Sequence, residues 1–342
     1  MEIAREMNFA KMLEEKEHVP GPMIHFNPID LKVGGFRRRL VVLGGFSGSF
    51  KSTFALNIAY NNAIKLGYTV AILSLEMDAY ELWLKFLIRH AQHPKFSKYR
   101  IDVTVPNGMW SKLSIEQKDF LKGIVGPDLA GDVRENKYGN IIIITADDLF
   151  KYKANNLLNA AVERLDELGV NFGIDLFIID YLQLLAGSIR PSIADKYQFS
   201  GDVIRSLKNL TQAYKSLDGE GLNVIALSQM NREGFKNAVL LKGKYDLTSL
   251  AESSELVNAA DMVITLFADA EDKKAKKCKV QLLKNRFGEE ILDPIEMLAI
   301  PEIAYMGDYR QSTNEEMGDL VHSLLGIRTL PEPCNFRNGV KL

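Results

Sequence analysis

The sequence predicts an α/β fold with a mostly parallel central sheet and helices on both faces. From about residue 38 onward, short apolar stretches alternate with longer helical ones, which is the order of elements in parallel sheets. Several of the apolar stretches are unbroken, as expected for strands that helices cover on both sides. The chain has 342 residues, which is enough to bury a large core.

Individual elements follow from this pattern. The apolar runs predict strands at Leu40–Leu43, Val70–Leu75, Ile141–Thr145, Leu176–Asp180, Val224–Ser228, Met262–Phe267 and Lys279–Leu283. The stretches between them predict helices at Ser52–Leu66, Ala79–Ala91, Asn155–Leu168 and Lys196–Leu217. We interpret Val239–Leu256 as a loop followed by a short helix.

The two ends of the chain differ from its middle. Residues 1–26 are interpreted as an N-terminal arm, a charged amphipathic helix and linker that Pro20, Gly21 and Pro22 interrupt. Residues 27–310 form the predicted main domain. Residues 311–342 read as a C-terminal tail, because Pro331 and Pro333 stand there among few periodic apolar positions.

Composition excludes few classes of protein. The net charge of −2 argues neither for nor against nucleic acid, so any contact with DNA must be local. No apolar run reaches the ~18 residues of a membrane span, and the amino-terminal residues lack an apolar signal core. We therefore expect a cytoplasmic protein without a membrane partner. Cys278 and Cys334 offer no metal-binding spacing and no disulfide framework.

A loop of small residues connects the first predicted strand to the first predicted helix. It comprises Gly45, Phe46, Ser47, Gly48, Ser49, Phe50, Lys51, Ser52 and Thr53. Such a loop turns backbone N–H groups toward an anion, and the helix adds its positive N-terminal end. Lys51 would reach the β- and γ-phosphates of ATP, and the Ser52 hydroxyl would bind Mg²⁺. The alternative is a glycine-rich turn that binds nothing.

Two carboxylates end the next candidate strands. Glu76 follows Val70–Leu75, at the edge where open α/β sheets place ligands, and could orient and deprotonate the water that attacks the γ-phosphate. The alternative is that Glu76 only caps the helix that begins near Ala79. Asp180 ends the apolar run Leu176–Asp180 and would hold Mg²⁺ through water.

Four short motifs stand at the ends of predicted strands. They are Ser74–Met77 (SLEM), Ile179–Leu184 (IDYLQL), Ala226–Arg232 (ALSQMNR) and Lys284–Gly288 (KNRFG). In this order they resemble the motifs of DnaB-family replicative DNA helicases, whose motor domain is a RecA-like P-loop NTPase that forms a hexameric ring. The resemblance covers roughly residues 38–290 and does not extend to the helical domain through which many bacterial members meet primase.

The resemblance implies the loop and carboxylate roles given above and adds three residues. Gln229 would sense the γ-phosphate, since an amide both donates and accepts and its contacts change when the phosphate leaves. Lys284 and Arg286 would point across a subunit interface at the neighbour's γ-phosphate, where an arginine neutralises charge in the transition state. The alternatives are an ordinary polar strand end for Gln229 and two solvated bases for the pair.

The chain departs from the family at two places. Phe50 stands where the phosphate loop usually has its second glycine, and a Cβ there strains the loop. Ala251 and Ser254 replace an arginine and a glycine in the loop that grips DNA in the family. The remaining candidates for contact with DNA are Arg190, Lys196, Glu252, Ser253 and Ser254.

The resemblance implies a motor that uses ATP and Mg²⁺ to move 5′ to 3′ along single-stranded DNA. Its expected partners are further copies of the chain in a hexameric ring, single-stranded DNA, and a primase or a helicase loader. Its expected setting is replication of a phage, a plasmid or a bacterial chromosome. The alternative is a RecA-like regulatory or assembly ATPase that unwinds nothing.

Overall fold

The structure is a computed structural model and describes residues 21–104, 110–131, 138–152, 157–187, 193–214, 221–250 and 253–308. Within these ranges one nine-stranded sheet has the order β3-β2-β4-β5-β1-β6-β7-β8-β9. The strands are β1 Leu40–Gly45, β2 Val70–Ser74, β3 Ile141–Thr145, β4 Leu176–Asp180, β5 Asn223–Gln229, β6 Met262–Phe267, β7 Lys277–Asn285, β8 Ile291–Ile300 and β9 Tyr305–Gly307. The neighbours from β3 to β6 are parallel, whereas β7, β8 and β9 join antiparallel.

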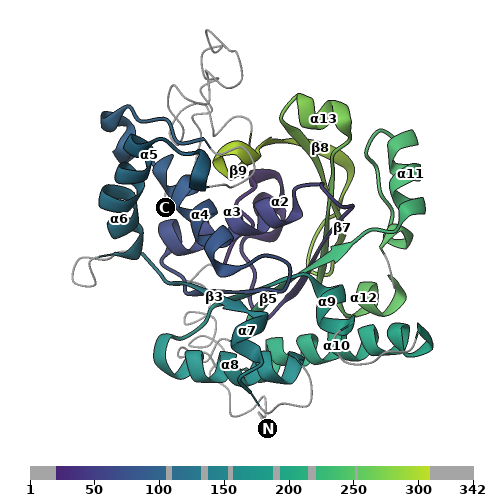
Figure 1. The fold of residues 1–342 in the computed structure, drawn as a ribbon. Coiled ribbons are helices and arrows are strands. Elements are labelled where there is room, and N and C mark those ends of the chain that lie inside the picture. The colour runs from purple at the N-terminus through teal and green to yellow at the C-terminus, as the bar shows by residue number, and fades with distance from the viewer. Residues whose placement is uncertain are drawn as a thin grey trace, which may run out of the picture.

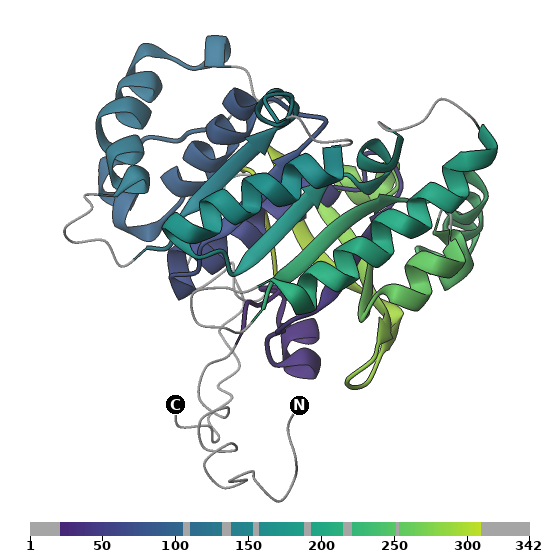
Figure 2. The ribbon, with the colours of Figure 1, turned by 90° about the horizontal axis from the view of Figure 1, so that it is seen from below.

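Helices cover both faces of this sheet. In the described residues they are α2 Asn27–Val33, α3 Lys51–Leu66, α4 Ala79–Ala91, α5 Ile115–Phe120, α6 Gly126–Ala130, α7 Ala146–Leu149, α8 Leu157–Phe172, α9 Leu182–Gly187, α10 Ile193–Ala213, α11 Arg232–Leu240, α12 Ser253–Ala259 and α13 Ala270–Lys274. Figure 1 shows α2, α3 and α4 on one face, and Figure 2 shows α8 and α10 lying across the other. No helix in the described ranges is long and apolar enough to span a bilayer.

The alternation of side chains along β1 explains the two layers. Leu40 and Val42 belong to one buried cluster, together with residues of α8 and α10. Val41 and Leu43 belong to a second, together with residues of α3. A strand with apolar side chains on both faces must be covered twice, so the predicted fold class is confirmed.

The structure adds elements that were not predicted along the whole chain, among them the short helices α2, α5, α6, α7 and α9. The strands β8 and β9 and the helix α11 were not predicted from the sequence. Within the stretch taken as a loop and a short helix, a short 3₁₀ turn, Leu247–Ser249, precedes α12. Part of the segment assigned to the N-terminal arm packs on the domain: Ile24 and Phe26 are buried in the cluster that contains α3, and Met23 N donates to Asn62 Oδ1 at 2.9 Å.

Candidate nucleotide site

The phosphate loop connects the carboxyl end of β1 to the start of α3. A cavity of about 270 Å³ opens there, lined by Ser47, Gly48, Phe50, Lys51, Ser52, Thr53, Glu76, Asp180, Tyr181 and Gln229. These residues come from the ends of β1, β2, β4 and β5, which the sheet order places side by side. The structure therefore brings Glu76, Asp180 and Gln229 to the loop, as the sequence predicts.

Close packing fixes the path of the loop. A Cβ on Gly45 would lie 2.3 Å from Ser49 Oγ and 2.9 Å from the carbonyl oxygen of Leu266, so only glycine fits. The buried Ser49 hydroxyl donates to the carbonyl oxygen of Phe46 at 2.7 Å. The ring of Phe46 stacks on Phe235 of α11, with centroids 4.3 Å apart. Gly45, Phe46 and Ser49 thus shape the loop from outside the cavity.

Phe50 adopts the backbone conformation that the family's glycine would supply. Its φ is 67°, in the left-handed region, and it is the residue before α3. That conformation costs an L-residue about 1–2 kcal/mol relative to the right-handed one. The partly buried ring packs against the cluster that contains α3, which offsets part of this cost. Phe50 therefore occupies the left-handed position before α3 despite its Cβ.

Lys51 lies inside the loop. Its ammonium group donates to the carbonyl oxygens of Gly45 and Phe46, at 2.8 and 3.0 Å, and the residue is 9% exposed. Burial lowers the pKa of Lys51 to about 8, although the carboxylates of Asp180 and Glu76 act in the opposite direction. A polyphosphate would provide the strong anionic partner that two neutral carbonyls cannot.

Ser52 and Asp180 form the candidate metal position. The Ser52 side chain hydrogen-bonds to the Asp180 carboxylate, and burial raises the pKa of Asp180 in spite of this bond and the nearby Lys51 charge. One hydroxyl and one carboxylate are the sparse oxygen set that Mg²⁺ uses when phosphates and water supply the rest. In the described ranges no group of three or more His, Cys, Asp or Glu side chains could hold a metal ion. The residues present therefore fit Mg²⁺ bound together with a nucleotide.

The capping alternative for Glu76 is wrong in this structure. The cap of α4 is Asp78, whose Oδ1 accepts from the backbone N–H of Glu81 at 2.7 Å. Glu76 is instead exposed and faces the cavity. Its carboxylate is therefore open to whatever the cavity holds.

Gln229 ends β5 and is held by a residue that the sequence reasoning missed. The side-chain oxygen of Gln183, at the start of α9, accepts from the backbone N–H of Gln229 at 3.3 Å. The same amide donates to Ser228 Oγ at 3.0 Å. Gln183 belongs to the motif Ile179–Leu184. Its position shortly after Asp180, at the end of a predicted strand, could have indicated that it lies near the site. It links the strand of Asp180 to the strand of Gln229.

Tyr181 and Lys85 were also missed. Tyr181 lines the cavity directly after Asp180. Burial lowers the pKa of Lys85, while Glu81, Asp180 and Glu76 raise it, so this lysine lies within electrostatic reach of both candidate carboxylates. Lys85 is on α4, two helical turns after the cap. No motif in the sequence marks it as a residue of the site.

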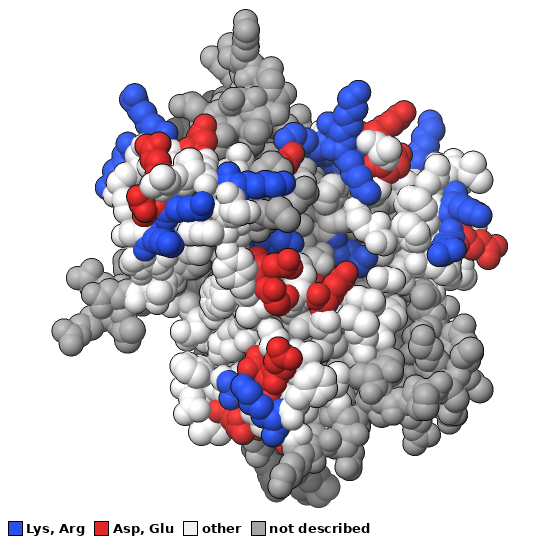
Figure 3. Space-filling view, viewed as in Figure 1, with Lys and Arg blue, Asp and Glu red and all other residues white. Residues whose placement is uncertain are grey.

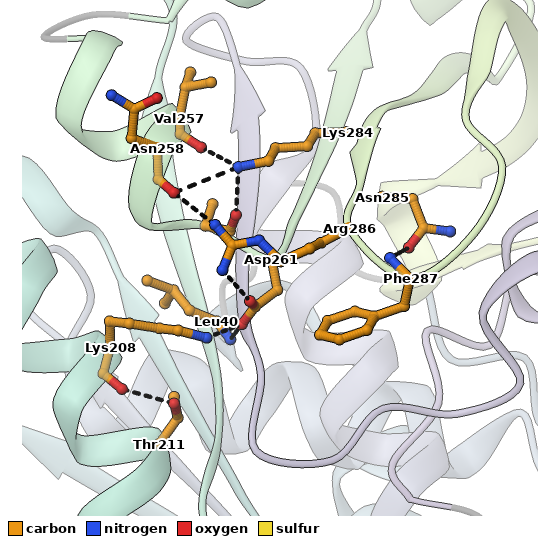
Figure 4. Close-up of polar contacts among 11 residues, drawn as sticks. Leu40, Lys208, Thr211, Val257, Asn258, Asp261, Lys284, Asn285, Arg286 and Phe287 are labelled. Carbon is orange, nitrogen blue, oxygen red and sulfur yellow. Dashed lines mark hydrogen bonds and ion pairs between the residues drawn. The ribbon is translucent and has the colours of Figure 1, made fainter.

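Lys284 and Arg286 lie near Leu40, at the end of β1 opposite to the phosphate loop; Figure 4 shows them beside Leu40 and Asp261. The antiparallel β7 places Lys284 opposite Val263 and Asn285 opposite Met262, at the start of β6. Asp261, which contacts Arg286, also accepts from the N–H of Leu40, the first residue of β1. From Leu40 to Gly45 a strand extends about 16 Å, farther than an arginine side chain reaches. Within one chain the basic pair is therefore remote from the phosphate loop.

The candidate residues for DNA contact lie mostly beyond what the structure describes. Arg190 and Glu252 are outside the described residues. Lys196 is in α10, and Ser253 and Ser254 begin α12, but their side chains are outside the described part. On the face in Figure 3, basic and acidic side chains are mixed rather than gathered into one basic surface.

Comparison with known proteins finds relatives over most of this chain. Residues 21–298 match the family described as DnaB-like helicase C terminal domain. The replicative DNA helicase DnaB of Geobacillus stearothermophilus is 28% identical over 265 residues, 76% of this chain and 50% of that protein. The replicative DNA helicase DnaC of Bacillus subtilis (strain 168) is 26% identical over 267 residues, 77% of this chain and 50% of that protein. The chain thus spans about half the length of these relatives.

Solved structures share the fold. One solved ATPase domain aligns with a TM-score of 0.62 at 20% identity, covering 88% of this chain and 95% of that one. A DnaB-like replicative helicase, described with its interactions with primase, also aligns at 0.62, with 22% identity and coverage of 90% of this chain and 67% of that one. The fold is that of a RecA-like P-loop NTPase.

Proposed function

Since the chain belongs to the DnaB-like helicase C-terminal domain family, we propose that it is an ATP-hydrolysing motor that moves 5′ to 3′ along single-stranded DNA. The observation that carries this proposal is the cavity at the phosphate loop, where Lys51, Ser52, Glu76, Asp180 and Gln229 converge. Phosphoryl transfer to water needs four kinds of group, and these residues supply them: a cation, an oxygen pair for Mg²⁺, an exposed carboxylate and an amide.

Each residue has a distinct task in this proposal. Lys51 leaves its two carbonyl partners and binds the β- and γ-phosphates, and the loop N–H groups bind the remaining oxygens. Ser52 and Asp180 would hold Mg²⁺, which supplies neutralisation of charge on the phosphates when bound. Glu76 accepts a proton from the attacking water at its carboxylate oxygen. Gln229 contacts the γ-phosphate, and Gln183 passes a change at β5 to α9.

We further propose that Arg286 and Lys284 complete the site of a neighbouring copy. The distance along β1 supports this, because the pair cannot serve the phosphate loop of its own chain. Such a site requires subunits joined head to tail, and we propose a hexameric ring around single-stranded DNA. A primase is a further proposed partner, because the structure of a similar helicase is described with its interactions with primase. A helicase loader is proposed as an alternative partner from the family resemblance alone.

The test combines ATPase and unwinding assays. ATPase activity should rise when single-stranded DNA is added, and a forked duplex should be unwound with ATP and Mg²⁺. An ATPase that ignores DNA and unwinds nothing would instead support the regulatory or assembly ATPase that the sequence left open.

Mixing two inactive variants tests completion of the site in trans. Lys51→Ala and Arg286→Ala should each lack ATPase activity, and their mixture should recover part of it. Recovery follows because some interfaces pair an intact loop with an intact arginine. Full ATPase activity of Arg286→Ala, or no recovery on mixing, contradicts the trans arrangement.

A further inference from the structure

The basic pair at the end of β7 is held in place by its own chain. Lys284 Nζ donates to the carbonyl oxygens of Val257 and Ala260, at 2.5 and 2.8 Å. Arg286 Nη2 donates to the carbonyl oxygen of Asn258 at 2.9 Å. These carbonyls lie at the C-terminal end of α12, where helices present unpaired acceptors and favour cations. Figure 4 shows both side chains meeting there.

Asp261 is at the centre of this arrangement. Its Oδ1 accepts from Arg286 Nη1 at 3.2 Å, and its backbone carbonyl accepts from the backbone N–H of Arg286 at 2.9 Å. Its Oδ2 accepts from the N–H of Leu40 at 2.9 Å and from Lys208 Nζ of α10. The carboxylate is 1% exposed, whereas the Arg286 side chain is 45% exposed. One buried anion therefore fixes both the backbone and the guanidinium of a residue that remains open to solvent.

Two cations pair with the Asp261 carboxylate in the described part of the chain, Lys208 and Arg286. Lys284 lies within electrostatic reach of the same carboxylate but bonds to carbonyl oxygens instead. A guanidinium has five N–H donors, and the contacts to Asp261 and Asn258 use two of them. An anion brought by another molecule would complete the set, and the proposed neighbour's γ-phosphate is such an anion.

We propose that Asp261 is the positioning residue for Arg286, holding the guanidinium in the orientation in which it meets the neighbour's nucleotide. This inference rests on the proposed role of Arg286 in trans. Asp261 touches neither substrate nor metal, and it acts only through the arginine that it holds. Because Asp261 also holds Lys208, the placement of Arg286 is tied to α10 as well as to α12.

The principal variant is Asp261→Asn, which keeps the size of the side chain and an oxygen for the Leu40 N–H but removes the charge. Affinity for a fluorescent ATP analogue should be unchanged, because the phosphate loop is remote. The kcat for ATP should fall about 10²-fold with KM unchanged, the scale expected when a catalytic group is misplaced by about 1 Å. The matched control is Asp293→Asn, which removes an exposed carboxylate paired with Lys244 and should leave both quantities unchanged.

Mixing experiments separate positioning from a structural role. Asp261→Asn mixed with Lys51→Ala should recover ATPase activity, since Lys51→Ala chains donate a correctly held Arg286 to intact loops. Asp261→Asn mixed with Arg286→Ala should recover nothing, because neither chain donates a working arginine. Three results would each overturn the proposal. They are recovery of ATPase activity in the second mixture, loss of nucleotide binding by folded Asp261→Asn, and an unchanged kcat of Asp261→Asn for ATP.

The outcomes for Arg286 and Asp261 can be told apart. If Arg286→Ala keeps full ATPase activity, the proposed function of the pair in trans fails. If Arg286→Ala behaves as proposed while Asp261→Asn resembles the wild type, only the role of Asp261 fails. Should Asp261→Asn not fold by circular dichroism, Asp261→Glu takes its place. Asp261→Glu keeps the negative charge but displaces it, so we expect the same loss of kcat with intact nucleotide binding. An unchanged kcat in that variant would contradict the proposal.

Discussion

The ammonium group of Lys51 lies 2.8 Å from the carbonyl oxygen of Gly45, so the cation that would bind phosphate is held by the loop itself. Its burial lowers the pKa to about 8. In the native state without nucleotide, Lys51 therefore binds fewer protons between pH 8 and the usual lysine pKa of about 10.5 than it does in the unfolded state. Stability rises with pH wherever the unfolded state binds more protons.

We predict that the wild type gains stability relative to Lys51→Met as pH rises from 7 through 9.5. The measurement is the difference in Tm between the two proteins without nucleotide, at several pH values in matched ionic strength. A difference that does not change with pH would mean that Lys51 keeps its ordinary pKa in the loop.

Glu76→Gln should keep ATP binding and lower ATP hydrolysis by ~10²-fold or more, the scale of a general base. The control is Asp78→Ala, which removes the cap of α4. That change should lower the free energy of unfolding by about 1 kcal/mol and leave hydrolysis intact. If Glu76→Gln hydrolyses ATP normally, the base is another residue.

Phe50→Gly should leave ATP affinity similar or raise turnover, because it supplies the residue that the left-handed φ of 67° favours. Phe50→Ala is the matched control, since both variants lose the ring and only alanine keeps the strained backbone. We expect Phe50→Gly to be more stable than Phe50→Ala by about 1 kcal/mol in thermal or denaturant unfolding. Loss of ATP binding in Phe50→Gly would show instead that the loop depends on the aromatic ring.

A buried histidine predicts acid sensitivity outside the site. His90 Nδ1 lies 2.7 Å from the Tyr60 hydroxyl and Nε2 lies 2.8 Å from Asp128 Oδ2, so the Nε2 proton donates to the carboxylate and Nδ1 accepts. Burial lowers the pKa of His90 to about 4, against 6.5 normally. The unfolded state therefore binds more protons between these values, and this contribution to stability is lost as pH falls from 6.5 to 4.

The wild type should accordingly be more stable than His90→Gln at pH 7, and the difference in Tm should shrink toward pH 5. The same melting experiment at the two pH values checks this. If the difference in Tm between the wild type and His90→Gln does not change with pH, the substitution acts through packing alone.

The sequence predicted the core of the fold because the parallel strands are continuous apolar runs between helices. The bounds of β3, β4 and β6 agree with the prediction. The strand β8 was missed because Asp293, Pro294 and Glu296 interrupt its apolar pattern. At the far edge of the sheet its partners β7 and β9 supply the pairing, which no local pattern reveals.

Some residues of the candidate site could be predicted from the sequence and others could not. Residues at strand ends were predictable, since parallel strands bring their carboxyl ends to one edge. The cap of α4 was not predicted correctly: the sequence analysis considered only Glu76, whereas the structure places Asp78 at that position. The burial of Lys51 between carbonyls and the contact of Asp261 with Arg286 depend on tertiary packing, so only the structure shows them.

The phosphate loop and Arg286 occupy opposite ends of β1, and this restricts the symmetry of any active assembly. In the proposed arrangement each chain offers two different surfaces, and the loop surface of one copy must meet the arginine surface of the next. A twofold dimer pairs one surface with itself, so it would leave loop and arginine unmatched. Head-to-tail contacts either close into a ring or continue as a filament. In an open chain of copies, the loop at one end would lack its arginine, and only closure makes every site equivalent.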